Sequence, residues 1–258
     1  MEINLQPHPG RIAALVLIVL GPLLWLMFGH GTPIEQDRGY HIFADARRCI
    51  GVENFGNVAS NLLFLLVGAA GARWCWRNRS GAWRSWLVFF SGVALVFLGS
   101  TYYHSAPGDD TLVWDRLPMT VAFMGLFAAL VSEHLDARLE LRLLSAALIT
   151  GLASVFWWQH NGDLRIYIWV QGAPLLAIPF VVMAFPGKYT LRVFLLYGVA
   201  LYALAKVAEV FDHEIYAISG TAISGHSVKH LLAGAAVFCV FWMLQRRRQS
   251  LTPVASSQ

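Results

Sequence analysis

Eight long apolar stretches constrain the fold of this chain more than any other feature. A helix needs about 20 apolar residues to cross a bilayer core about 30 Å thick. Stretches of that kind occupy residues 11–29, 57–76, 85–104, 114–133, 141–159, 165–185, 190–210 and 224–245. Apolar residues make up 57% of the 258 residues and charged residues only 13%, which is too little polar surface to cover a soluble domain. The sequence therefore predicts an all-α integral membrane protein with eight spans.

The first of these stretches has the position of a secretory signal. Its apolar run from Ile12 to Phe28 is too long for a typical signal core, however, and no small-residue cleavage site follows it. We therefore expect 11–29 to be a retained transmembrane helix added before a seven-helix core at 57–245. The chain 1–258 is predicted to be one membrane domain, with an ordered loop at 30–56 and a polar, disordered tail at 249–258.

Lysine and arginine predict the orientation of the spans, because they are enriched in cytoplasmic loops. Twelve of the 19 cationic residues flank one side of the predicted membrane: Arg11, Arg73, Arg77, Arg79, Arg84, Arg138, Arg142, Lys188, Arg192, Arg246, Arg247 and Arg248. Both termini are thus expected in the cytoplasm. This distribution also explains the net charge of +4 without a nucleic-acid partner. The short loops favour a bacterial inner membrane.

Polar residues within the spans are costly in lipid, so each is a candidate for function. Ser100 and His104 lie one helical turn apart near the end of 85–104, and Asp115 opens 114–133. His226 and His230 share one helical face, at a spacing found in zinc sites. Each feature alone has a structural explanation: a hydroxyl bonded to its own backbone, an interfacial cap, an N-cap acid, or a chance spacing.

The common position of these residues strengthens the functional interpretation. Their three helices alternate in direction, yet His104, Asp115, His226 and His230 all fall at non-cytoplasmic ends. Three histidines with an open fourth position are the ligand set of a catalytic zinc, whose bound water has a pKa of about 7. A nearby carboxylate such as Asp115 can act as general base, and a hydroxyl such as Ser100 can donate to a developing oxyanion.

A fourth polar group ends the stretch 190–210. Lys206 and Glu209 could pair within the bundle, and Asp212, His213 and Glu214 read as solvated loop residues. We favour a structural role for this group.

These residues, in this order, resemble the alkaline ceramidase family, within a superfamily that also contains adiponectin- and progestin-type receptors. The resemblance rests on Asn57-Val58-Ala59-Ser60-Asn61, Ser100-x-x-x-His104, Asp115 with Leu117-Pro118-Met119, and His226-x-x-x-His230. It implies a seven-helix core and a zinc ion bound by His104, His226 and His230, with Asp115 and Ser100 beside it. It also implies cleavage of lipid amides to a fatty acid and a sphingoid base.

Animal alkaline ceramidases also carry an acidic calcium site before their first core helix. In the comparable stretch 45–54, Asp45, Glu53 and Asn54 could supply oxygen ligands. The stretch also contains Arg47 and Arg48, which argue against a tight calcium site.

The leading hypothesis is a zinc-dependent lipid amidase whose substrate enters from the bilayer between helices. The alternatives are a glycerolipid-remodelling hydrolase with the same site and a seven-helix receptor or lipid-binding protein that keeps the zinc for structure. A haem protein fits poorly, since haem usually takes one histidine from each of two facing helices. A transporter lacks support, because the sequence shows no internal repeat. The sequence leaves open amide or ester substrates, calcium regulation and oligomeric state.

Overall fold

A computed structural model describes residues 9–185 and 187–250 of the chain. This part contains eight helices that are long and apolar enough to cross a membrane. The all-α prediction with an additional N-terminal helix is confirmed. The helices are α1 (Pro9–Leu24, extended by a π-helical turn over Trp25–Gly29), α2 and α3 (Phe55–Ser60 and Leu62–Asn78, together one span), α4 (Trp83–Ser105), α5 (Asp109–His134), α6 (Glu140–Asn161), α7 (Arg165–Ala184), α8 (Val193–Val210) and α10 (Gly225–Arg246), with a short α9 (Asp212–Ile218) before α10.

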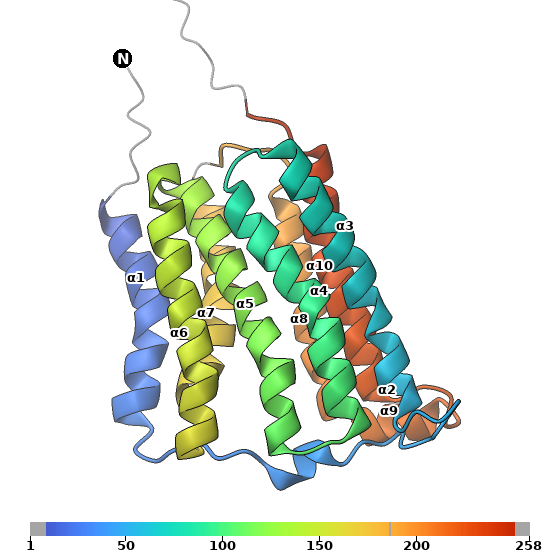
Figure 1. Ribbon diagram of the computed structural model, residues 1–258. Coiled ribbons are helices and arrows are strands. Elements are labelled where there is room, and N and C mark those ends of the chain that lie inside the picture. Colours follow the sequence, from blue (N-terminus) through green and yellow to red (C-terminus); the bar gives the residue numbers. More distant parts are fainter. Residues whose placement is uncertain (1–8, 186, 251–258) are drawn as a thin grey trace, which may run out of the picture.

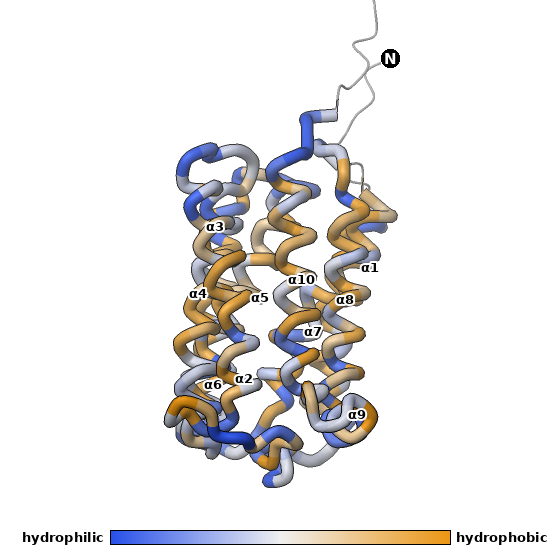
Figure 2. Tube along the Cα trace, turned by 90° about the vertical axis from the view of Figure 1, so that its right-hand side faces the viewer, coloured by the Kyte–Doolittle hydropathy of each residue, from blue (hydrophilic) through white to orange (hydrophobic). Residues whose placement is uncertain are grey.

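The spans form a bundle in which α1 lies at one edge (Figure 1). Helix α1 packs mainly against α7, where the indole Nε1 of Trp169 donates to the carbonyl of Val19 at 2.7 Å. The remaining spans surround a common interior, with α3, α4 and α5 as successive neighbours and α10 between α3 and α8. Hydrophobic residues dominate the middle of the bundle and hydrophilic residues gather at its two ends (Figure 2). This is the distribution that a bilayer requires.

The loop between α1 and α2 runs across one end of the bundle (Figure 1). Because α4 ends and α10 begins there, we call it the histidine end. Backbone hydrogen bonds hold the loop in place, including Leu164 N to Ile34 O at 2.8 Å. Asp163 also accepts from the backbone N–H of Ile34 and ion-pairs with Arg165 at 2.8 Å. An ordered loop at this position agrees with the expectation from its length.

Small residues let α4 and α5 approach closely. A Cβ added to Gly99 of α4 would lie 2.0 Å from the carbonyl oxygen of Trp114, and one added to Gly92 would lie 2.6 Å from the backbone nitrogen of Ala122. Such small-residue contacts are a common means of packing helices in membranes. The close approach places the end of α4, with His104, against the beginning of α5, with Asp115.

Two sequence predictions differ from the structure in their boundaries. Helix α5 begins at Asp109 rather than at 114, so Asp115 lies inside the helix and is not an N-cap. Asp109 and Asp110 occupy the first turn instead, where acidic side chains favour the positive end of the helix dipole. The predicted tail begins with Gln249 and Ser250, which pair with the segment before α8 through Ser250 N to Lys188 O at 2.9 Å. Residues 251–258 lie outside the described part.

Candidate metal centre

Three histidines meet at the histidine end, one from α4 and two from α10. His104, His226 and His230 are buried, and one ring nitrogen of each lies within 4.8 Å of the corresponding nitrogens of the other two. Their ring centroids are 4.8 to 5.2 Å apart. Among the described residues this is the group of metal-ligating side chains that converges in this way. The structure therefore brings together the three residues that the sequence predicted as ligands.

Ser60 of α2 fixes the orientation of the His230 ring. The Ser60 Oγ donates to the carbonyl of Asn57 at 2.9 Å and lies 2.8 Å from Nδ1 of His230. With the hydroxyl proton directed to the carbonyl, Nδ1 of His230 donates to Ser60. The opposite nitrogen, Nε2, then carries a free lone pair, which is the tautomer needed to bind a metal.

His104 has no hydrogen-bond partner on either ring nitrogen within the described ranges, although it is fully buried. Buried polar atoms are normally satisfied, so an orphaned imidazole calls for a ligand. Phe43 belongs to the loop over the histidine end. Its ring centroid lies 4.7 Å from the ring centroids of both His104 and His226. This aromatic contact covers the two rings on the side of the loop.

The first turn of α10 is held by the side chains of Ser224 and Asp212. Ser224 is its N-cap and accepts from the backbone N–H of Ser227 at 3.1 Å. Asp212 of α9 accepts from the backbone N–H of His226 at 2.7 Å and from that of Ala44 at 2.9 Å. The prediction that Asp212 is a solvated loop residue is therefore wrong: it is buried and positions the helix that carries His226 and His230.

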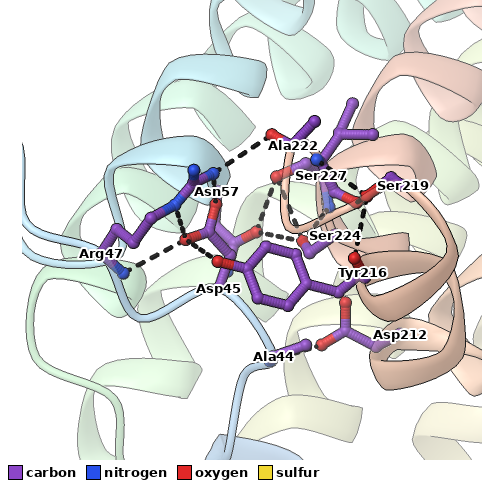
Figure 3. A network of polar contacts seen from close by, with 11 residues as sticks. Ala44, Asp45, Arg47, Asn57, Asp212, Tyr216, Ser219, Ala222, Ser224 and Ser227 are labelled. Carbon is purple, nitrogen blue, oxygen red and sulfur yellow. Dashed lines mark hydrogen bonds and ion pairs between the residues drawn. The ribbon is translucent and has the colours of Figure 1, made fainter.

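Asn57 of α2 connects this turn to the first core span. Its Oδ1 accepts from the hydroxyls of Ser224 and Ser227 at 3.2 and 2.9 Å, and these residues lie side by side in Figure 3. The same network continues to Asp45, whose carboxylate accepts from Arg47 at 2.7 and 2.8 Å (Figure 3). Hydrogen bonds from Arg47 lower the pKa of Asp45 below its ordinary value, although burial opposes them.

The residues considered for calcium make other contacts. Asp45 pairs with Arg47 and Glu53 pairs with Arg48 at 3.4 Å. The amide Nδ2 of Asn54 donates to the carbonyl of His104 at 2.8 Å and so closes the end of α4. In this structure the stretch holds the loop against the end of α4 and against the segment before α10.

Asp115 and Ser100 lie side by side on neighbouring helices. The Ser100 hydroxyl interacts with the carboxylate of Asp115, and both residues are buried and line the same cavity as His230. The structure therefore brings together the hydroxyl and the carboxylate that the sequence singled out.

The cavity that contains these groups has a volume of about 390 Å³. Its lining is polar near Asp115, Glu209 and His230, and apolar along the bundle, where Val93, Leu126, Phe89, Ile178, Leu195 and Val240 line it. A cavity of this size falls in the usual range for small-molecule sites. A polar end joined to an apolar interior suits an amphipathic lipid.

Lys229 is a neighbour of the site that sequence reasoning missed. Its Nζ lies 2.8 Å from Nε2 of His226 and donates to Glu209 at 2.9 Å. Glu209 also pairs with Lys206, as the sequence suggested, and accepts from the Tyr40 hydroxyl at 3.1 Å. The sequence spacing shows the pair on α8, but contact with α10 depends on how the two helices face each other.

The donor set fits zinc. Neutral imidazoles are preferred zinc ligands, and three of them leave a fourth position for water or substrate. The orphaned His104 ring and the fixed tautomer of His230 are what such a site requires.

Comparison with known proteins supports the same interpretation. No curated protein matches the chain. The family model described as ceramidase matches residues 51–255, which include all three histidines, Ser100 and Asp115 but not α1. Since that match covers most of the chain and the buried histidines occur within it, the protein belongs to the ceramidase family of membrane hydrolases.

Proposed function

We propose that the protein is a zinc-dependent amidohydrolase that cleaves ceramide-like lipids to a fatty acid and a sphingoid base. The observation that carries this proposal is the group of three buried histidines beside Asp115, at the polar end of an otherwise apolar cavity. Membership in the ceramidase family supports the lipid amide as substrate.

His104, His226 and His230 would hold the metal. A zinc ion in this donor set would supply a Lewis acid for the amide carbonyl and make water acidic near neutral pH. The contact of Ser60 with the His230 ring, and the bond from the Asn54 side-chain amide to the backbone carbonyl of His104, keep two of the three histidines in place.

Asp115 would move the proton. Its carboxylate accepts a proton from the attacking water, whose oxygen forms the new bond to the carbonyl carbon. When the carbon–nitrogen bond breaks, the same carboxyl group donates that proton to the departing amine. Ser100, which interacts with this carboxylate, would hold it in position for both transfers.

The cavity would orient the lipid. The acyl chain lies along the apolar wall formed by α4, α5, α7, α8 and α10, and the amide is then presented to the polar end. We propose that the substrate enters from the bilayer, where ceramide-like lipids are dissolved.

The cation distribution supports an orientation with both termini in the cytoplasm and the metal centre near the opposite face. The predicted cytoplasmic loops hold twelve of the 19 cationic residues.

The test combines metal analysis with a hydrolysis assay on the detergent-purified full chain. We expect about one zinc per chain and release of fatty acid from ceramide, both lost together in His226→Ala. The matched control is His160→Ala, since His160 is exposed on α6 at the same end. A diacylglycerolipid assayed in parallel separates amide from ester cleavage.

Two results would contradict the proposal. Absence of stoichiometric transition metal in folded wild-type protein would remove the metal centre. Stoichiometric zinc without release of fatty acid from any amide or ester would favour the receptor or lipid-binding alternative.

A further inference from the structure

Arg116 is a buried cation that the reaction above does not use. It follows Asp115 on α5, is 5% exposed and lines the cavity. No carboxylate within the described ranges lies within ion-pair distance of it. An unpaired charge in such surroundings is unfavourable, so its presence requires an explanation.

Two aromatic rings hold the guanidinium in place. Its central carbon lies 3.9 Å from the ring centroid of Trp158 and 4.6 Å from that of Tyr167. These cation–π contacts stabilise the charge without using its N–H donors. The side chain is therefore fixed in the cavity wall by contacts that do not themselves use its N–H donors.

The donors of Arg116 are only partly used. One, Nη2, donates to the side-chain oxygen of Gln36, from the loop over the histidine end. The other, Nη1, is buried and has no partner in the described ranges. A buried N–H group without an acceptor is rare in native proteins and points to a missing partner.

The lysines of the cavity differ from Arg116 in this respect. Lys206 and Lys229 each have an ion-pair partner, because both contact the carboxylate of Glu209. A guanidinium is also the side chain best suited to a planar or tetrahedral oxyanion, because its donors match two oxygens at once.

We propose that Arg116, assisted by Gln36, binds an anionic group on the amine-bearing half of the lipid substrate. The chemical class is a phosphate, sulfonate or carboxylate attached to the sphingoid-like base. The assignment of the anion to the amine-bearing half of the lipid rests on the proposed function. Arg116 adjoins Asp115, which protonates the departing amine, whereas the acyl half occupies the apolar end of the cavity.

The kinetic test compares two lipid amides with the same acyl chain and base, namely ceramide and ceramide 1-phosphate. We expect the zinc-loaded wild-type protein to have the higher kcat/KM for the phosphorylated lipid. Arg116→Met keeps an unbranched side chain between the two rings and should lower that value about tenfold to hundredfold, the range for hydrogen bonds to charged groups. Hydrolysis of ceramide should change less than threefold, and Arg116→Lys should recover part of the loss. Arg138→Met, at an exposed position, is the control.

Equal losses on both lipids in Arg116→Met would assign the arginine a purely structural role and overturn the inference. So would a wild-type protein that prefers the neutral lipid.

A binding measurement separates this inference from the proposed function. The thermal unfolding midpoint of each variant is recorded with ceramide, with ceramide 1-phosphate and with inorganic phosphate. A rise specific to ceramide 1-phosphate in wild type but not in Arg116→Met supports the anion site even if no lipid is hydrolysed. The same rise with inorganic phosphate alone would identify a site for free phosphate and overturn the lipid assignment. No difference between the two variants would overturn the inference even if ceramide is hydrolysed.

Discussion

The bundle buries polar groups at both ends, and the two clusters differ in how completely they are satisfied. At the end opposite the histidines, Glu133 of α5 pairs with Arg247 at 2.5 and 2.7 Å. Its Oε1 also accepts from the Trp86 indole at 2.9 Å and from the backbone N–H of Ala82 at 3.1 Å. Both side chains are almost entirely buried, and the carboxylate is fully used by donors from the same chain.

At the histidine end, several buried atoms lack partners in the described residues. They include both ring nitrogens of His104, the amide of Asn61 and Nη1 of Arg116. Both clusters carry the cost of polar groups in lipid. The Glu133 carboxylate is compensated internally, and the buried atoms without partners near it are the neutral hydroxyls of Ser85 and Ser132. At the histidine end the unpartnered groups include an imidazole and a guanidinium, which are the groups that bind metals and anions.

The largest effect is expected at the histidine end, from the loss of proton transfer by Asp115. Asp115→Asn should retain zinc and lower the turnover of ceramide by about 10²–10⁴-fold, the usual contribution of general acid–base catalysis. Metal content and kcat measured on the same preparation test this. Full activity in Asp115→Asn would show that another group moves the proton.

Substitutions in the Glu133–Arg247 pair should lower stability and leave the zinc content unchanged. Arg247→Met leaves the Glu133 carboxylate buried without its ion-pair partner and should cost about 3–5 kcal/mol, whereas the double variant Glu133→Leu/Arg247→Met should recover most of that loss. Thermal unfolding reports stability, and zinc per folded chain reports the site. Loss of zinc in the folded single variant would show that the two clusters are not independent.

A smaller effect is expected from the group that orients His230. Ser60→Ala removes the acceptor of its Nδ1–H and should weaken zinc binding about 10–100-fold without changing the ligand set. Competition with a chelator of known affinity measures this change. Ser105→Ala, at an exposed hydroxyl near the end of α4, should leave zinc affinity unaltered.

The smallest effect concerns a satisfied acid at the histidine end. Burial raises the pKa of Asp163, but hydrogen bonds from Arg165 and from the Ile34 backbone outweigh it and lower the pKa to about 2, from an ordinary value of 3.8. A depressed folded-state pKa adds stability above the ordinary value, and that stability is lost as pH falls toward 2. The difference in unfolding midpoint between wild type and Asp163→Asn should therefore be present at pH 6 and shrink below pH 4. A difference independent of pH would assign the role of Asp163 to its shape rather than to its charge.

The spans and the grouping of the three histidines could be predicted from the sequence because lipid imposes strong local rules. A span must be long and apolar, and a histidine within it is conspicuous. The start of α5 was harder to predict, because Asp109 and Asp110 have the polarity of a loop although they begin the helix.

The supporting residues were harder to predict, because their roles depend on contacts between distant segments. Asp212 lies in a short polar stretch without periodicity, yet it joins the loop at Ala44 to the start of α10. Ser60 belongs to a motif noted in the sequence, but its contact with His230 requires the packing of α2 on α10. The open donor of Arg116 is likewise visible only when every neighbour is placed.

The position of Phe43 has a kinetic consequence. Because this residue of the covering loop packs on the rings of both His104 and His226, a metal approaching from the loop side must wait until the loop lifts. At high chelator concentration, the rate of zinc removal by that route becomes the rate of loop opening. The rate of metal exchange would then measure the rate of loop opening, which equilibrium affinities do not report.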